Sequence, residues 1–149
     1  MVDQAVPEPI DILLIEDDPG DVLLTREAFA DHKLGNHLVV FGDGREARRY
    51  LRGQAPYAGV PRPDLILLDL NLPSLDGREL LAGLADDPAL ATIPVVILTS
   101  SLAERDIMHA RQLRVAGYIV KPVDFAQLIT VIKNIEGLAL TVFRVPSPV

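Results

Sequence analysis

Five short apolar runs alternate along the chain with longer segments in which apolar and polar residues are mixed. The runs are rich in Val, Ile and Leu, and several have no polar interruption, which is typical of strands buried on both faces of a sheet. They are Ile10–Ile15, His37–Gly42, Leu65–Leu68, Val95–Leu98 and Gly117–Val120. Because a helix-length segment follows each run, the pattern predicts an α/β fold, a doubly wound five-stranded parallel sheet with helices on both faces.

The segment after the fifth run has the clearest helical pattern. Asp124 stands at an N-cap position after Pro122, and Gly137 fits the end of the helix. The apolar positions recur at the spacing of one helix face, and they are Phe125, Leu128, Ile129, Ile132 and Ile135.

Two regions lie outside this alternation. The segment Arg52–Asp64 is a loop marked by proline and glycine, and it is longer than the usual connection. Residues 137–149 are apolar and have no partner in the alternating pattern. We therefore predict a flexible N-terminus over residues 1–9, one domain over residues 10–136 and a separate C-terminal tail over residues 137–149.

Composition restricts the class of protein. A chain of 149 residues is long enough for one domain with a real core. Its 14 Lys and Arg residues against 21 Asp and Glu residues give a formal charge of −7. Because we find no basic cluster that would neutralise phosphates, we expect no nucleic acid as a partner. Cysteine is absent, which excludes disulfides, thiolate zinc sites and cysteine nucleophiles.

The start of the chain, MVDQAVPEP, lacks the basic segment and the apolar core of a signal peptide. No apolar run approaches the ~18 residues that are needed to span a bilayer. We therefore expect a cytoplasmic protein that has no membrane partner.

Polar side chains follow four of the five predicted strands. In parallel sheets, ligands bind at the carboxyl ends of the strands, so we expect these side chains to lie at one edge. They are Glu16, Asp17 and Asp18 after the first strand, Asp69 and Asn71 after the third, Thr99, Ser100 and Ser101 after the fourth, and Lys121 after the fifth. Several carboxylates would thus converge beside a hydroxyl and an ammonium group.

Carboxylates that lie close together repel one another, and a shared proton or a cation is the usual remedy. Magnesium suits this set better than zinc, because the chain has no cysteine and no pair of histidines at ligand spacing. Lys121 adds a point charge and Thr99 adds a hydrogen-bond donor, which together favour a phosphoryl group. Asp69 is then the expected acceptor, since an aspartate carboxylate can form an acyl phosphate.

Each of these residues also has an ordinary structural explanation. Asp18 is best explained as the N-cap of a helix that starts at Pro19, Thr99 fits a helix cap, and lysine–proline pairs are common. The occurrence of such residues at four successive strand ends favours a shared function over separate coincidences.

Four motifs in combination resemble the response-regulator receiver domain of two-component signalling. They are LLIEDD at 13–18, LLDLNLPSLDG at 67–77, VILTSS at 96–101 and AGYIVKP at 116–122. The resemblance covers roughly residues 10–136 and implies the flavodoxin-like (βα)5 receiver fold. It also implies that Asp69 is the phosphoacceptor.

The same resemblance implies a metal site. Asp17 corresponds to a direct Mg²⁺ ligand, and Glu16 to a residue that acts on the metal mainly through water. Asp69 and the main-chain carbonyl of Asn71 complete the protein's share of the metal shell.

Thr99 and Lys121 take the phosphate-sensing positions of the family. By resemblance, the phosphohistidine of a histidine kinase donates to Asp69 while Mg²⁺ and Lys121 offset the charge of the transferring group. Thr99 then moves toward the new phosphate, and Tyr118 turns into the vacated space. The alternative is that Tyr118 is an ordinary strand aromatic with an exposed hydroxyl. The family also predicts a cis bond between Lys121 and Pro122.

A narrower resemblance rests on EDDPGDVLLTREAF at 16–29, KPVDF at 121–125, the long loop and the tail. These features are similar to stand-alone receivers that partner bacterial phytochrome histidine kinases. Few residues follow Glu136, so we expect the output to come through association with another protein. We expect a homodimer through the last helix and the apolar tail residues Leu138, Leu140, Val142, Phe143 and Val145. The alternative is a tail that folds back onto its own sheet or is disordered.

Three functional classes remain open. The first is a phosphorylatable receiver, a signalling protein rather than an enzyme, which assists its own phosphoryl transfer and dephosphorylation. The second is a docking module that works without phosphorylation, and it is disfavoured because every chemical position carries an acceptable residue. The third is a hydrolase of the haloacid dehalogenase type. That family typically has a second aspartate where Asn71 stands, and this chain leaves little room for a cap domain.

Overall fold

The computed structural model describes residues 8–30, 37–70, 72, 77–104, 115–132, 134–135 and 143–144. Several predictions fall outside the described residues, namely those for residues 1–7, Asn71, Gly137, Leu138, Leu140, Val142 and Val145. The side chains of residues 8, 9, 125, 143 and 144 also lie outside the described part.

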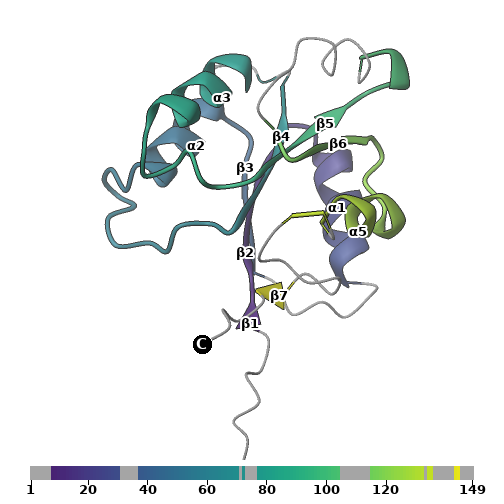
Figure 1. Ribbon diagram of the computed structural model, residues 1–149, viewed down its shortest axis with the longest axis horizontal. Coiled ribbons are helices and arrows are strands. Elements are labelled where there is room, and N and C mark those ends of the chain that lie inside the picture. The colour runs from purple at the N-terminus through teal and green to yellow at the C-terminus, as the bar shows by residue number, and fades with distance from the viewer. Residues whose placement is uncertain are drawn as a thin grey trace, which may run out of the picture.

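Strands and helices alternate along the described chain (Figure 1). The strands are β1 (Glu8–Pro9), β2 (Asp11–Ile15), β3 (His37–Phe41), β4 (Leu65–Asp69), β5 (Val95–Thr99), β6 (Gly117–Val120) and β7 (Phe143–Arg144). The helices are α1 (Pro19–Ala30), α2 (Gly44–Leu51), α3 (Gly77–Asp86) and α5 (Phe125–Ile132). Between β5 and β6, residues 102–104 are helical, and residues 105–114 lie outside the described part.

Strands β2 to β6 form a five-stranded sheet in the order β3-β2-β4-β5-β6, and every neighbouring pair is parallel. Figure 1 shows α2 and α3 on one face of this sheet and α1 and α5 on the other. The predicted doubly wound parallel sheet is therefore confirmed. The strand order reverses between β2 and β4, which is the place where sheets of this kind bind their ligands.

Two strands extend one residue further than the apolar pattern predicted. Asp69 pairs in register with Leu98, and Thr99 pairs with Val120. The reason is that ladder hydrogen bonds join backbone groups, which continue past the last apolar side chain. Asp69 and Thr99 are therefore carried by the sheet itself and not by the loops that follow it.

The sheet separates two hydrophobic cores, because successive residues of a strand point to opposite faces. In β4, Ile66 and Leu68 belong to the core that includes α2 and α3, whereas Leu65 and Leu67 belong to the core that includes α1 and α5. Strands β4 and β5 are buried along their whole length, as expected of strands covered on both faces.

Aspartate side chains cap the starts of three helices, where the first turn leaves backbone N–H groups without partners. The hydrogen bonds run from Gly20 N to Asp18 Oδ1 at 3.0 Å, from Arg45 N to Asp43 Oδ1 at 2.8 Å and from Gln127 N to Asp124 Oδ1 at 2.8 Å. The caps predicted at Asp18 and Asp124 are confirmed.

The long loop Arg52–Asp64 packs against the domain through an aromatic cluster. The rings of Phe41, Tyr50 and Tyr57 contact one another with centroid distances of 5.2, 5.6 and 5.5 Å. The Tyr57 hydroxyl also donates a hydrogen bond to Glu46 Oε2 at 2.8 Å. The loop is therefore attached to β3 and α2 by the side chain of Tyr57.

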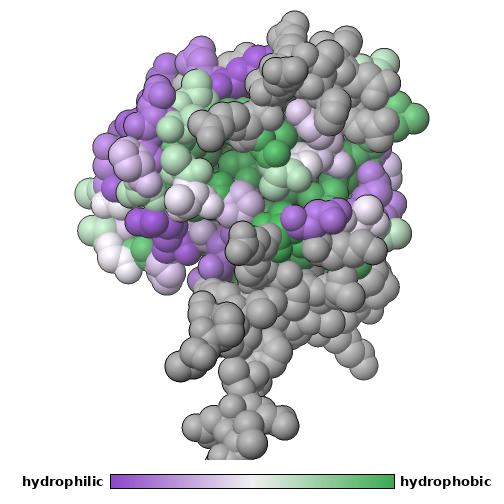
Figure 2. Space-filling model, viewed as in Figure 1, coloured by the Kyte–Doolittle hydropathy of each residue, from purple (hydrophilic) through white to green (hydrophobic). Residues whose placement is uncertain are grey.

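Helix α2 presents a basic face, so the expectation that the chain has no basic cluster was wrong. The inner side of the helix buries Gly44, Ala47 and Leu51. Four arginines of α2 and its C-cap line a hollow together with Gln54 and with Glu79 of α3, namely Arg45, Arg48, Arg49 and Arg52. Figure 2 shows hydrophilic residues gathered on this side of the molecule. The net charge of −7 hid this local excess of positive charge.

The two ends of the described chain pair with each other. Strand β1 is antiparallel to β7, with Glu8 opposite Arg144 and Pro9 opposite Phe143. Figure 1 places this pair at one end of the molecule, beyond β2. Within the described ranges, no helix has the length and apolar character needed to cross a membrane.

Candidate functional site

The predicted site residues within the described chain lie at one edge of the sheet. Glu16 and Asp17 follow β2, Asp69 ends β4, Thr99 ends β5 and Lys121 follows β6. Because β2, β4, β5 and β6 are consecutive neighbours in a parallel sheet, the five side chains start from the same edge.

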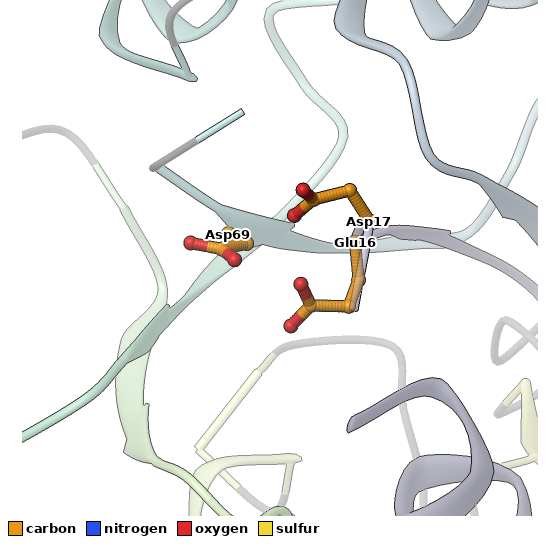
Figure 3. A group of neighbouring side chains, drawn as sticks. All are labelled: Glu16, Asp17 and Asp69. Carbon is orange, nitrogen blue, oxygen red and sulfur yellow. The ribbon is translucent and has the colours of Figure 1, made fainter. Parts of the chain in front are cut away.

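Three carboxylates meet at this edge. One carboxylate oxygen from each of Glu16, Asp17 and Asp69 lies within 4.8 Å of the other two. Figure 3 shows Glu16 and Asp17 extending from the end of β2 on the side where Asp69 lies. Glu16 and Asp69 are only 1% and 5% exposed, whereas Asp17 is exposed, so solvent reaches the group on the Asp17 side.

Lys121 supplies positive charge to these carboxylates. Its Nζ lies 2.6 Å from Glu16 Oε1, 2.9 Å from Asp69 Oδ2 and 3.2 Å from Asp21 Oδ2. Burial lowers the pKa of Lys121, but the hydrogen bond to Asp69 and the close ion pair with Glu16 outweigh burial and raise the pKa above the ordinary lysine value. The ammonium group is therefore charged at neutral pH. The Lys121–Pro122 peptide bond is cis, as predicted.

Asp21 is a neighbour of the site that the sequence analysis did not single out. It lies in the first turn of α1, three residues after the N-cap Asp18, and its carboxylate pairs with Lys121. The available signal was an acidic residue in the first turn of a helix that starts at the carboxyl edge of the sheet.

Glu16 is buried near two other carboxylates, those of Asp17 and Asp69, and near one ammonium group, that of Lys121. Its Oε2 accepts a hydrogen bond from Asp18 N at 3.2 Å, and its Oε1 pairs with Lys121 without a hydrogen bond of good geometry. Burial raises the pKa of Glu16, and Asp69 raises it further, while Lys121 and the Asp18 N–H lower it; the resulting pKa is about 7. The negative charge of the carboxylates at this edge is thus greater than the single positive charge of Lys121.

The donors at this edge fit a hard divalent cation. Glu16, Asp17 and Asp69 offer oxygen atoms, which Mg²⁺ and Mn²⁺ prefer, whereas zinc sites usually contain nitrogen or sulfur ligands. Magnesium commonly takes a small number of carboxylates and fills its remaining positions with water or phosphate oxygens. Asn71, whose carbonyl was expected to join this set, lies outside the described residues.

Thr99 and Tyr118 lie on the same face of the sheet. Tyr118 pairs in register with Ile97, two residues before Thr99, and side chains two residues apart on a strand share a face. Thr99 is fully buried, its Oγ1 donates to Ser101 O at 3.3 Å, and its carbonyl accepts from Lys121 N at 2.7 Å. Tyr118 is half-buried against the core on the α2 and α3 side, and burial raises the pKa of its hydroxyl.

Gly77 allows α3 to begin directly against the strand end that carries Asp69. Its N–H donates a hydrogen bond to Leu70 O at 3.0 Å. A Cβ atom at this position would lie 2.5 Å from Leu70 Cα and 2.9 Å from Asp69 O, and close-packed backbone atoms cannot yield that much. Any larger residue at the end of the motif LLDLNLPSLDG would therefore force the backbone of α3 or β4 to shift.

Comparisons with known proteins agree with this geometry. The family model for the response regulator receiver domain matches residues 12–133. The response regulator Rcp1 of Synechocystis sp. is 38% identical over 147 residues, which cover 99% of each chain. A solved structure of the Mn²⁺-bound form of response regulator Rcp1 covers 76% of this chain and 81% of its own, with 43% identity and a TM-score of 0.68.

Two further solved structures belong to response regulators that are linked to phytochromes. The bacteriophytochrome response regulator AtBRR has a TM-score of 0.80 and 42% identity, with 86% of this chain and 93% of its own chain covered. The phosphorylated cyanobacterial phytochrome response regulator RcpA has a TM-score of 0.70 and 47% identity, with 86% and 91% covered. On the family match, these relatives and the five-stranded parallel sheet, the chain belongs to the response regulator receiver domain family.

Proposed function

We propose that the protein is a stand-alone response regulator that accepts a phosphoryl group on Asp69 from a sensor histidine kinase. Response regulators of this family serve phosphoryl acceptance in two-component signalling, and the relative RcpA has been solved in its phosphorylated form. One observation carries the assignment to Asp69. Its carboxylate lies within 4.8 Å of oxygens of Glu16 and Asp17, and Lys121 Nζ lies 2.9 Å from its Oδ2.

In this proposal Asp69 acts as the nucleophile. A bond forms between a carboxylate oxygen of Asp69 and phosphorus while the phosphorus–nitrogen bond of the donor phosphohistidine breaks. The electron pair of the broken bond remains on the imidazole nitrogen. Lys121 offsets the negative charge of the transferring group, since its ammonium already contacts the acceptor carboxylate. Catalysis of this kind depends mostly on positioning, which the buried strand end provides.

Mg²⁺ is the proposed cofactor. Asp17 and Asp69 would bind it directly, Glu16 would act mainly through water, and the Asn71 carbonyl would complete the set. When bound, the cation would neutralise charge on the phosphoryl oxygens. The surplus of carboxylates over the charge of Lys121 supports this proposal, as does the Mn²⁺-bound form of the relative Rcp1.

Thr99 and Tyr118 are the proposed switch. Thr99 would move toward an oxygen of the phosphoryl group on Asp69, and Tyr118 would turn into the space that Thr99 leaves. The shared sheet face of the two residues supports this coupling. The half-buried ring of Tyr118 supports it too, because a side chain at the boundary of the core has a buried and an exposed environment available.

The proposed partners are a phytochrome histidine kinase and a second copy of this chain. The relatives AtBRR and RcpA are phytochrome response regulators, which supports the first partner. The homodimer would form through α5 and the apolar tail over residues 137–149. Nucleic acid is not among the proposed partners, because the four arginines on and next to α2 belong to a chain whose net charge of −7 opposes phosphate binding as a whole.

Phosphorylation by acetyl phosphate, followed by intact mass, tests the proposal. With Mg²⁺ we expect wild-type protein to gain one phosphoryl group, and we expect no gain without Mg²⁺ or in Asp69→Asn. Asp86→Asn is the matched control. Asp86 is an exposed aspartate at the end of α3, so this variant should gain one phosphoryl group as the wild type does.

Two results would contradict the proposal in different ways. An undiminished gain in Asp69→Asn would place the acceptor at another residue. No gain in the wild type, with the fold intact and Mg²⁺ binding measured, would instead favour the docking module that works without phosphorylation.

A further inference from the structure

One side chain of α5 makes an extensive set of hydrogen bonds beside Lys121. Strand β6 is the last strand in the described sheet, so one of its edges faces away from β5. On that edge Gln127 Oε1 accepts a hydrogen bond from Val120 N at 3.0 Å, and Gln127 Nε2 donates to Val120 O at 3.0 Å. A side-chain amide thus pairs with both backbone groups of one strand residue, as a neighbouring strand would.

The same amide reaches across the residues that follow β6. Its Nε2 also lies 3.1 Å from Pro122 O and 3.2 Å from Asp124 Oδ2. These partners fix the orientation of the amide. Val120 N requires an acceptor, whereas the carbonyls of Val120 and Pro122 require a donor. Gln127 therefore joins the end of β6, the turn after it and the first turn of α5.

Lys121 lies inside this joined unit. It stands between Val120 and Pro122, whose carbonyl oxygens both accept hydrogen bonds from Gln127. Its own N–H donates to Thr99 O on β5 at 2.7 Å. The backbone of Lys121 is thus held toward β5 on one side and toward α5 on the other, while its side chain extends to the carboxylates.

A lysine that has to place its charge accurately needs such support. The flexible lysine stem carries about 2 kcal/mol of rotamer entropy, so the ammonium is well placed only when the backbone that carries it is fixed. Lys121 Nζ lies 2.9 Å from Asp69 Oδ2, and a shift of about 1 Å would take it beyond hydrogen-bonding distance.

We propose that Gln127 is a positioning residue for phosphoryl transfer, which holds the backbone of Lys121 so that its ammonium meets Asp69. This inference rests on the proposed function of Asp69 as the phosphoacceptor. Gln127 acts through Lys121, and the phosphoryl group itself makes no contact with it. The same hydrogen bonds also cover the outer edge of β6, which is a purely structural role, and the experiment has to separate the two.

Gln127→Met removes the hydrogen bonds of the side chain and preserves its approximate length and its helix propensity. We expect the rate of phosphorylation by acetyl phosphate with Mg²⁺ to fall by about 10- to 100-fold, which is typical of a misplaced catalytic group. Mg²⁺ should still bind to this variant, because the three carboxylates are untouched. Thr130→Ala is the matched control: it removes the 2.8 Å hydrogen bond from Thr130 Oγ1 to Ala126 O on the same helix and should leave the rate unchanged.

A second background distinguishes positioning from a structural role. If Gln127 acts through Lys121, then Gln127→Met slows the wild type but has no further effect in a Lys121→Ala background. Equal slowing in both backgrounds would overturn the proposal, and so would a wild-type rate for Gln127→Met alone.

The outcomes also separate this inference from the proposed function. If the wild type gains no phosphoryl group, both fail; if the wild type and Gln127→Met react at the same rate, the inference alone fails. Thermal unfolding shows whether each variant is folded. If Gln127→Met does not fold, Gln127→Glu takes its place in both backgrounds, because it keeps the acceptor for Val120 N and loses the donor to the two carbonyls.

Discussion

The ammonium group of Lys121 has three hydrogens and three carboxylate neighbours, Glu16, Asp69 and Asp21. If Asp69 is the phosphoacceptor, as proposed, a phosphoryl oxygen on it has to take over one of these contacts. The contact with Asp21 is the longest, at 3.2 Å, and 25% of the Asp21 side chain is exposed. The Glu16 and Asp69 side chains are only 0% and 7% exposed, so we expect the contact with Asp21 to yield first.

Asp21→Asn should therefore speed phosphorylation by acetyl phosphate. Without the negative charge of Asp21, the ammonium of Lys121 is more available to the phosphoryl oxygens. The loss of such an ion pair corresponds to an increase in rate of about two- to fivefold. Intact mass as a function of time measures the rate. Glu27→Gln is the control, because it removes an exposed charge of α1 elsewhere on the helix. A slower reaction in Asp21→Asn alone would show that Asp21 helps to place Lys121.

The sequence could locate Asp69 and Lys121 because each stands next to an apolar run, and the topology of a parallel sheet brings such positions together. Asp21 and Gln127 could not be located in the same way. Both lie in helices, and their contacts with the site depend on how each helix is rotated against the sheet. The backbone partners of Gln127 also leave no mark on the sequence pattern.

At the scale of elements, the contact between α3 and β4 depends on Gly77. Gly77→Ala should destabilise the fold by about 1–3 kcal/mol, since the new methyl group meets the backbone at Leu70 and Asp69. Chemical denaturation measures the free energy of unfolding. Gly83→Ala in the same helix is the matched control: a methyl group there would meet no other part of the described chain within 4 Å, so alanine should stabilise the helix by about 0.5–1 kcal/mol. Equal stability of the two variants would mean that α3 can move away from β4.

The aromatic cluster under the long loop predicts a pH dependence. The hydrogen bond to Glu46 raises the pKa of Tyr57 above its usual value of 10.0, and burial raises the pKa of Tyr50. A raised pKa in the folded state means that the stabilising contribution is full below pH 10.0 and is lost as the pH rises through the folded-state pKa. Phenolate absorbance should therefore appear at higher pH than in free tyrosine.

Glu46→Gln tests the cause of this shift. It removes the negative charge beside the Tyr57 hydroxyl, so part of the phenolate titration should return toward that of free tyrosine. Tyr50 should titrate as before, because its shift comes mainly from burial. A wild-type titration that matches free tyrosine would contradict the hydrogen bond itself.

The five main strands were predictable because their apolar runs are almost uninterrupted, and their two-sided burial follows from covering helices on both faces. Contacts between distant segments were not predictable. The packing of Tyr57 on Phe41 and the pairing of Glu8–Pro9 with Phe143–Arg144 join segments whose own patterns give no sign of a partner.

For the whole molecule, the proposed homodimer predicts a change in mass. Deleting residues 138–149 should convert a dimer into a monomer in sedimentation equilibrium, because it removes the apolar tail. Leu102→Ser is the control, since Leu102 is 59% exposed and lies outside α5 and the tail. The same mass before and after deletion would contradict a dimer built on the tail.

The central position of β4 in the sheet also determines how rigidly Asp69 is held. This strand lies between β2 and β5 and is buried along its whole length. Its amide hydrogens should exchange with deuterium only when the entire domain unfolds, whereas segments with few buried contacts exchange through local opening. The proposed acceptor carboxylate is therefore fixed to the part of the molecule that unfolds last. A conformational change that follows its proposed phosphorylation has to occur in segments that open more easily.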